Sequence, residues 1–248
     1  ETQPEGARYG SFRRGLAPDL ERRVRRRGWR LEELGEVVTQ FVIHYDVCGT
    51  SRQCFKVLHD RRGLSVHFML DVDGTLYQTL DLKERAWHAA VANDRSIGIE
   101  IANIGAYGSP DDDVLEAWYR RDSDGLRIEF PEWMKDTGIR SAGFVARPAR
   151  ERLIEGEVHE RKYYQYDFTS AQYRALAHLV AALTRIFPKL RLDYPRTKDG
   201  GHHWGVLSKE GLAAYTGLLG HYHVTTRKRD PGPAFDWDRL LREAEALR

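Results

Sequence analysis

The segment of residues 39–46, TQFVIHYD, constrains the fold more than any other part of the sequence. Its short apolar run is typical of a strand that is buried on both faces, and the run leads directly into His44. A histidine at the end of a rigid strand can be aimed at one fixed point, which is how a metal ligand is held. The commoner alternative is a buried histidine with a structural role, so the rest of the chain must decide between the two.

The periodicity of the other segments predicts a single domain that mixes strands and helices. Strands are expected where short apolar or alternating runs occur, at residues 37–45, 64–70, 75–80 and 96–103. Helices are expected at residues 18–27, 50–59, 169–187, 208–217 and 236–247. An Asp-Gly turn at residues 73–74 joins the second and third strands into a hairpin. The predicted fold class is therefore α/β (α+β), with a central mixed β-sheet flanked by helices.

Two regions depart from this regular pattern. Residues 105–165 follow the strand that ends near residue 103, lack a clean period and contain scattered aromatic residues, so we expect a long insertion that carries short elements. Residues 1–30 form an arginine-rich N-terminal extension, and we expect residues 1–17 to lie loosely on the surface. The catalytic domain is then expected over residues 31–248. The arginines indicate a solvated helix face, with contact to a polyanion or a partner as the alternative.

The charge balance and the lack of long apolar runs exclude two classes of protein. Lys and Arg total 39 against 37 Asp and Glu, which argues against a dedicated nucleic-acid binder. No apolar run approaches the roughly 18 residues that span a bilayer, so no transmembrane segment is expected. The sequence has no secretory signal and does not begin with methionine, and we expect a processed chain. The oligomeric state stays open at this point.

Three residues far apart in the sequence have the properties of a metal site. His44 ends a strand, His221 follows Gly220, and the backbone at Asp230 is restricted by the proline after it. A catalytic zinc site uses three protein ligands and keeps one position open for water. His223 is a rival ligand, because on an extended segment it would share a face with His221.

Two further residues have the chemistry that amide hydrolysis needs. In the segment SIGIEIAN, residues 96–103, isoleucines occupy one face and Glu100 is the only charged residue on the other. Such a carboxylate could act as the general base. Lys228 lies two residues before Asp230 and could face a developing oxyanion. The alternatives are a solvated strand residue and a plain basic loop.

Five segments of the chain together resemble a known family. They are FVIHYD (41–46), SVHFMLDVDGTLYQ (65–78), ERAWHAA (84–90), SIGIEIAN (96–103) and GHYHVTTRKRDPGPAFDW (220–237). The resemblance is to the zinc-dependent N-acetylmuramoyl-L-alanine amidases of the type-2 amidase and peptidoglycan-recognition-protein superfamily. It covers about residues 37–104 and 168–248, and the last segment is its most specific part.

The resemblance implies a set of roles and a reaction. It implies that His44, His221 and Asp230 bind Zn²⁺, that Glu100 is the general base, and that Lys228 stabilises the oxyanion. The implied reaction hydrolyses the amide between N-acetylmuramic acid and L-alanine in peptidoglycan or muropeptides. The alternative within the same superfamily is a module that recognises peptidoglycan without cutting it. The presence of all three predicted ligands together with Glu100 and Lys228 favours an enzyme over a module that only recognises peptidoglycan.

The resemblance also bears on the cysteines and on the substrate groove. From spacing alone, Cys48 and Cys54 could pair or be two chance thiols. The resemblance implies a close disulfide between them, and this favours a periplasmic or secreted location. Candidate substrate-binding residues share a place near the expected groove, although each could instead be structural. These candidates are Trp87, His88, His67 and Asn103.

Overall fold

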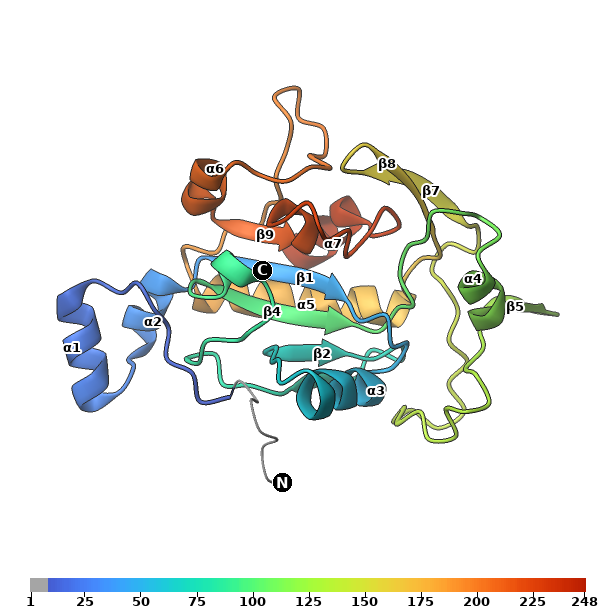
Figure 1. The fold of residues 1–248 in the computed structure, drawn as a ribbon, viewed down its shortest axis with the longest axis horizontal. Helices are drawn as coiled ribbons and strands as arrows, with labels where there is room; N and C mark the ends of the chain where they lie inside the picture. The colour runs from blue at the N-terminus through green and yellow to red at the C-terminus, as the bar shows by residue number, and fades with distance from the viewer. Residues whose placement is uncertain (1–8) are drawn as a thin grey trace.

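The computed structural model describes residues 9–248 and has a five-stranded sheet at its centre. The strand order is β3-β2-β4-β1-β9 (Figure 1). The strands are β1 (Gln40–Tyr45), β2 (Phe68–Leu70), β3 (Leu76–Gln78), β4 (Ser96–Ile101) and β9 (Gly217–Gly220). Within this sheet only β2 and β3 pair antiparallel, as the predicted hairpin requires, and the other neighbouring strands are parallel. The predicted mixed sheet and fold class are confirmed.

Two boundaries of the sheet differ from the sequence prediction. β1 begins later than predicted, because residues before it form the short helix α2 (Leu31–Val37). The helix predicted at 208–217 ends early as α6 (Lys209–Ala214), and the next residues form β9. This strand was missed because four residues with a glycine at each end are too short to show a period.

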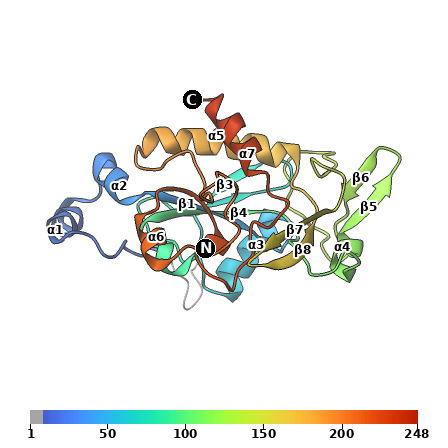
Figure 2. The same ribbon diagram turned by 90° about the horizontal axis from the view of Figure 1, so that it is seen from above.

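Helices cover both faces of the sheet (Figure 2). On one face lie α5 (Ser170–Ile186) and α7 (Trp237–Glu245), which contact each other and begin after the predicted caps Thr169 and Asp236. The isoleucines of β4 pack on this side in the main hydrophobic core, as predicted. The other side is flanked by α3 (Ser51–Phe55), which continues as a π-helix (Lys56–Arg61). The polar face of β4 therefore lies opposite the main core.

The segment predicted to be an insertion after β4 contains regular secondary structure. It contains α4 (Asp113–Trp118) and two hairpins, β5 (Tyr119–Asp122) with β6 (Gly125–Ile128) and β7 (Ile154–Val158) with β8 (Arg161–Gln165). It has a small core of its own around Leu115, Trp118 and Leu126. In Figure 1 these elements extend beyond the carboxyl ends of β1 and β4, so the insertion lies where a site at those ends can use it.

The N-terminal extension contains the predicted helix α1 (Pro18–Arg27), with exposed arginines that pair with nearby carboxylates. The segment before it does not lie loosely on the surface, because Arg13 is completely buried. That prediction is wrong for residues 9–17, while residues 1–8 lie outside the described part. Within the described residues, none of the helices has the length and apolar character to cross a membrane.

Candidate active site

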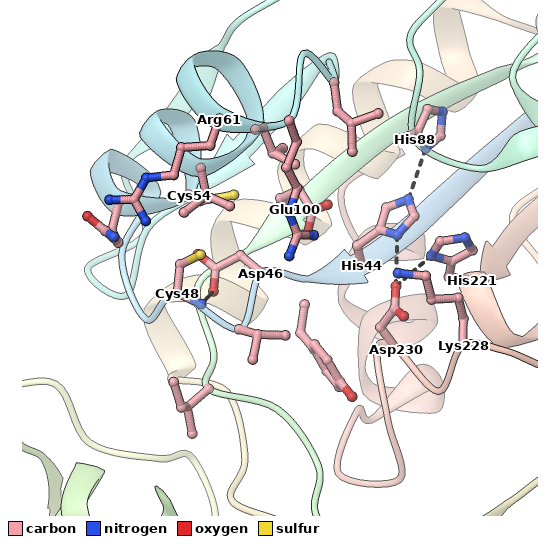
Figure 3. Close-up of a pocket in the computed structure, with 18 of the residues that line it drawn as sticks. His44, Asp46, Cys48, Cys54, Arg61, His88, Glu100, His221, Lys228 and Asp230 are labelled. Atoms are coloured by element: carbon pink, nitrogen blue, oxygen red, sulfur yellow. Dashed lines mark hydrogen bonds and ion pairs between the residues drawn. The ribbon is translucent and has the colours of Figure 1, made fainter.

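The three predicted metal ligands converge at one end of the sheet (Figure 3). Nδ1 of His44 lies 2.8 Å from Oδ2 of Asp230, and Nδ1 of His221 lies 3.0 Å from the same oxygen. β1 and β9 are neighbouring parallel strands, so His44 at the end of one and His221 just after the other meet at the same edge. Asp230 comes from the loop before α7. The sequence-based grouping is thus reproduced by the tertiary structure.

The charges of this cluster suit a cation. Burial, and after it the neighbouring His221, lower the pKa of His44 to about 4 against the opposing effect of Asp230. Burial alone would raise the pKa of Asp230, but its contacts with His221 and His44 outweigh that effect and hold the pKa far below its usual range. The site therefore holds an ionised carboxylate beside a neutral imidazole, the protonation states that metal binding requires.

The donor set passes the test for a metal site. One ligand atom from each of His44, His221 and Asp230 lies within 4.8 Å of the other two, and all three side chains are buried. Two imidazole nitrogens and one carboxylate oxygen form a known catalytic zinc set, which leaves a fourth position open. These residues could hold a metal ion.

His223, the rival ligand, has a structural role instead. Its Nδ1 accepts a hydrogen bond from the N–H of Gly220 at 2.8 Å, and its Nε2 donates to the carbonyl of His203 at 2.8 Å. Residues His221–His223 form a 3₁₀ turn, so the two histidines do not share a face as they would on an extended segment. Both ring nitrogens of His223 are occupied, and this alternative is excluded.

A cavity of about 810 Å³ opens beside the three ligands. Its wall includes the predicted residues Glu100, Lys228, Trp87 and His88. The insertion contributes aromatic residues that the sequence analysis did not assign, among them Tyr107, Trp118 and Trp133. The only signal for them in the sequence was the presence of aromatic residues in an otherwise polar, aperiodic segment. The insertion thus forms part of the site.

Glu100 is paired in register with His44 across β4 and β1, so both side chains project from the same face of the sheet. Burial raises the pKa of Glu100 well above its usual range, and the carboxylates of Asp230 and Asp46 raise it further. Its Oε2 has no hydrogen-bond partner among the described residues. Lys228 is exposed at the cavity wall, and its charge acts in the opposite direction on this pKa. Glu100 is half-buried and lines the cavity, and a carboxyl group with a raised pKa in such a position is suited to proton transfer.

The family model for N-acetylmuramoyl-L-alanine amidases matches residues 34–126, a segment that includes His44 and Glu100. The match covers little more than a third of the chain, and it shows that this part of the chain is similar to N-acetylmuramoyl-L-alanine amidases. The matched segment covers β1 to β4 and the start of the insertion, while His221 and Asp230 lie beyond it. The structure nevertheless brings these two residues together with His44.

Several solved amidase structures are similar to this chain. AmiD from E. coli, in complex with the substrate anhydro-N-acetylmuramic acid-L-Ala-D-γ-Glu-L-Lys, is 20% identical with a TM-score of 0.47, over 83% of this chain and 57% of that one. This chain thus spans little more than half the length of that AmiD chain. An AmpD derivative is 18% identical over 98% and 94% of the two chains, with a TM-score of 0.43. LysC from Clostridium intestinale URNW is 16% identical over 86% and 88%, with a TM-score of 0.45. No curated protein matches the sequence.

Two of the four predicted substrate-binding residues line the cavity. Trp87 is partly exposed there, and its Nε1 donates to the hydroxyl of Ser11 at 3.1 Å. His88 also lines the cavity, but Nδ1 of its ring lies 2.9 Å from Nε2 of His44. Trp87 keeps its predicted place in the groove, whereas His88 is directed at a metal ligand.

The structure contradicts substrate contact by the other two predicted residues. His67 is completely buried, accepts a hydrogen bond from the N–H of Gly98 at 3.1 Å, and donates to the carbonyl of Glu84 at 3.2 Å. Asn103 is also buried, and its side chain donates to the carbonyl of Tyr166. Both side chains are saturated by the fold and lie away from the cavity wall. The sequence placed His67 on a strand, facing away from its apolar neighbours, and Asn103 at the end of a strand. Burial rules out the groove role predicted for both.

The predicted disulfide is not formed, because Cys48 and Cys54 are free thiols in this structure. A hydrogen bond between the two thiols lowers the pKa of Cys48, and the nearby Arg62 and Arg61 lower it further against the effect of burial. Both cysteines line the cavity beside Glu100. The close approach that the resemblance implied is present, but the covalent bond is not.

Proposed function

We propose that this protein hydrolyses the amide bond between N-acetylmuramic acid and L-alanine in peptidoglycan or in muropeptides. The observation that carries the proposal is the convergence of His44, His221 and Asp230 beside Glu100 in one cavity. A protein that only recognises peptidoglycan has no need for three metal ligands and a half-buried carboxyl group in the same place. Because peptidoglycan lies outside the cytoplasmic membrane, the proposal includes a periplasmic or secreted location.

The metal in this proposal is a zinc ion, held by Nδ1 of His44, Nδ1 of His221 and Oδ2 of Asp230. When bound, the ion would polarise the scissile carbonyl and lower the pKa of water at the open position. The two imidazoles are neutral ligands and the aspartate carries one negative charge, so the site retains a net positive charge. That residual charge supports a Lewis-acid role rather than a purely structural one.

Glu100 would act as the proton carrier of the reaction. Its carboxylate would take a proton from the attacking water and deliver it to the leaving nitrogen of L-alanine. A pKa raised by burial and by neighbouring carboxylates suits a group that must first accept a proton and then release it.

Lys228 would stabilise the negative charge that develops on the carbonyl oxygen. Its side chain lies at the cavity wall with Arg227 and Arg229, so the approach to the site is positively charged. Trp87 lines the same cavity and is partly exposed there, with the guanidinium of Arg85 4.2 Å from the centre of its ring, and it would contact a sugar or peptide. These residues would position the substrate with its scissile bond near the three ligands.

The decisive experiment incubates the zinc-loaded protein with purified sacculi and with a soluble muropeptide. Mass spectrometry should detect a free N-terminal L-alanine on the released stem peptide and an intact lactyl carboxylate on the sugar. The matched control is Glu100→Gln, which should bind zinc and release no peptide above background. Binding to sacculi without release by the zinc-loaded wild type would overturn the proposal and indicate a recognition module.

A further inference from the structure

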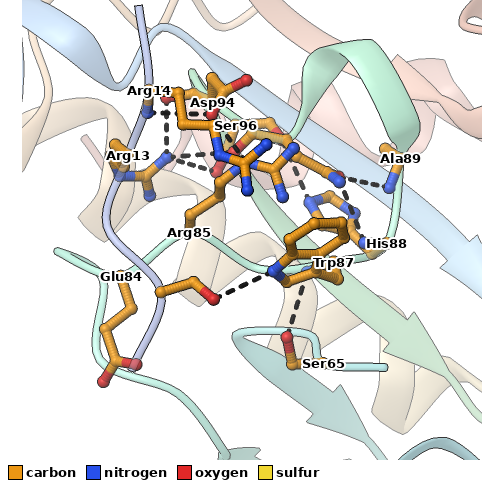
Figure 4. A network of polar contacts seen from close by, with 12 residues as sticks. Arg13, Arg14, Ser65, Glu84, Arg85, Trp87, His88, Ala89, Asp94 and Ser96 are labelled. Atoms are coloured by element: carbon orange, nitrogen blue, oxygen red, sulfur yellow. Dashed lines mark hydrogen bonds and ion pairs between the residues drawn. The ribbon is translucent and has the colours of Figure 1, made fainter. Parts of the chain in front are cut away.

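The ring of His88 lies between a metal ligand and a serine (Figures 3 and 4). Its Nδ1 is 2.9 Å from Nε2 of His44, and its Nε2 is 3.1 Å from the hydroxyl oxygen of Ser96. The rings of His44 and His88 are nearly perpendicular, with an interplanar angle of 81°. Both nitrogens of His88 are therefore engaged within the protein.

The strand beneath this ring is shaped to receive it. Gly98 of β4 lies under His88, and a Cβ atom at this position would come within 2.5 Å of Cε1 and Nδ1 of the ring. Such a distance is far shorter than van der Waals contact, so any other residue at position 98 would displace His88. The glycine, the serine and the two histidines form one packed unit.

The orientation of the His44 ring determines which nitrogen carries the proton in each of the hydrogen bonds that join His44, His88 and Ser96. Nδ1 of His44 faces Asp230 and the proposed metal position, so with metal bound the proton of the neutral ring is on Nε2. That N–H must donate to Nδ1 of His88, which leaves the proton of His88 on Nε2. The second N–H then donates to the hydroxyl oxygen of Ser96. Each hydrogen bond has one donor and one acceptor, and no proton is missing or in excess.

We propose that His88 is a positioning residue that accepts the Nε2 proton of His44 and thereby presents Nδ1 of His44 to the metal. The inference rests on the metal site of the proposed function. A hydrogen bond to the far nitrogen of a ligating histidine fixes its tautomer and ring orientation, and its loss costs about 10–100-fold in metal affinity. His88 therefore acts through His44 rather than on the substrate.

The N-terminal segment of residues 9–15 holds this unit in place (Figure 4). The backbone N–H of His88 donates to Oδ1 of Asn93 at 3.2 Å. The buried guanidinium of Arg13 donates to the carbonyl of Ser96 at 3.1 Å and to that of Asn93 at 3.5 Å. Arg13 thus binds two of the residues that contact His88, and it also donates to the carbonyls of Asp94 at 3.3 Å and Leu82 at 2.8 Å.

The first test measures the affinity for zinc by competition with a chelator. His88→Leu removes the acceptor and should weaken zinc binding by about 10–100-fold. His88→Asn places a carbonyl oxygen where Nδ1 lies and should recover much of that loss. His178→Leu, an exposed histidine on α5, is the matched control and should bind zinc like the wild type. Equal affinity of His88→Leu and wild type, or no recovery in His88→Asn, would overturn the inference.

The second test uses the zinc-loaded wild-type protein and needs no variant to fold. Nitrogen-15 NMR of the histidine rings should show the Nε2–H form for both His44 and His88. An Nδ1–H form of His88 would reverse the hydrogen bond and refute the assignment. These readouts report on metal and protons alone. A protein that binds zinc as expected but releases no stem peptide would contradict the proposed function and leave the role of His88 intact.

Discussion

His44 and Glu100 stand opposite each other in register on two neighbouring parallel strands, and both face the cavity. This pairing separates metal binding from proton transfer, because Glu100 is not among the three clustered ligands. Glu100→Gln keeps the shape of the side chain but cannot take up a proton as the carboxylate does. We expect unchanged zinc content by atomic absorption and a loss of amide hydrolysis of at least about 100-fold. Turnover near the wild-type rate would exclude Glu100 as the base.

Removing a predicted metal ligand should abolish zinc binding as well as hydrolysis. In Asp230→Ala the two imidazoles lose the only carboxylate of the set, and we expect zinc content and hydrolysis to be lost together. Treatment of the wild type with a chelator should give the same inactive state, and added zinc should restore it. Asp111→Ala, an exposed acid in the insertion, is the control and should keep both properties. Stoichiometric zinc in Asp230→Ala would show that the ion binds elsewhere.

The close packing of Gly98 against the ring of His88 can be tested by substituting the glycine. Gly98→Ala should force the His88 ring from its place, weaken zinc binding, and lower the free energy of unfolding by about 1–3 kcal/mol. Gly108→Ala is the matched control, since nothing lies within 4 Å of the Cβ it would add. Chelator competition and urea unfolding measure the two effects. If both variants behave alike, the contact between position 98 and His88 has no consequence.

The buried arginine of the N-terminal segment should matter for stability. Arg13→Gln leaves the carbonyls of Leu82 and Ser96 without their charged donor, and we expect the free energy of unfolding to fall by about 3 kcal/mol. Arg22→Gln, an exposed position on α1, should change it by less than about 0.5 kcal/mol. Chemical denaturation of both variants gives the comparison. A zinc affinity that falls in Arg13→Gln but not in Arg22→Gln would further connect this segment to the site.

The buried His67 should make the protein sensitive to acid. Burial and then the charge of Arg13 lower the pKa of His67 to about 3, whereas an unfolded histidine titrates near 6.5. Protonation therefore favours the unfolded chain, and stability should fall as the pH drops from about 6.5 towards 3. The slope from this one group is at most about 1.4 kcal/mol per pH unit.

The variant His67→Gln isolates this contribution, because glutamine does not titrate. Its free energy of unfolding in urea should depend less on pH between 7 and 4.5 than that of the wild type. The other buried histidines remain in both proteins, so the difference reports on His67. Parallel pH profiles for the two proteins would show that His67 does not stay neutral in the fold.

Much of the fold was predictable from local patterns. The alternation in β4 predicted which face is apolar and left Glu100 on the other, and Thr169 marked the start of α5. Local patterns failed where tertiary contacts dominate. β9 is too short to show a period, and an arginine such as Arg13 looks like any other surface arginine until the carbonyls that bind it are brought together.

The chemical identity of the candidate site was contained in the sequence, because two histidines, an aspartate and a glutamate at defined places in strands and loops already specify what can bind metal and carry protons. The roles of His88 and His67 depended on the tertiary structure. Both are histidines near the same strand, yet one hydrogen-bonds a metal ligand and the other is closed off beneath Arg13. A side chain's partners come from segments distant in the chain, and no local pattern encodes which of them will share its surroundings.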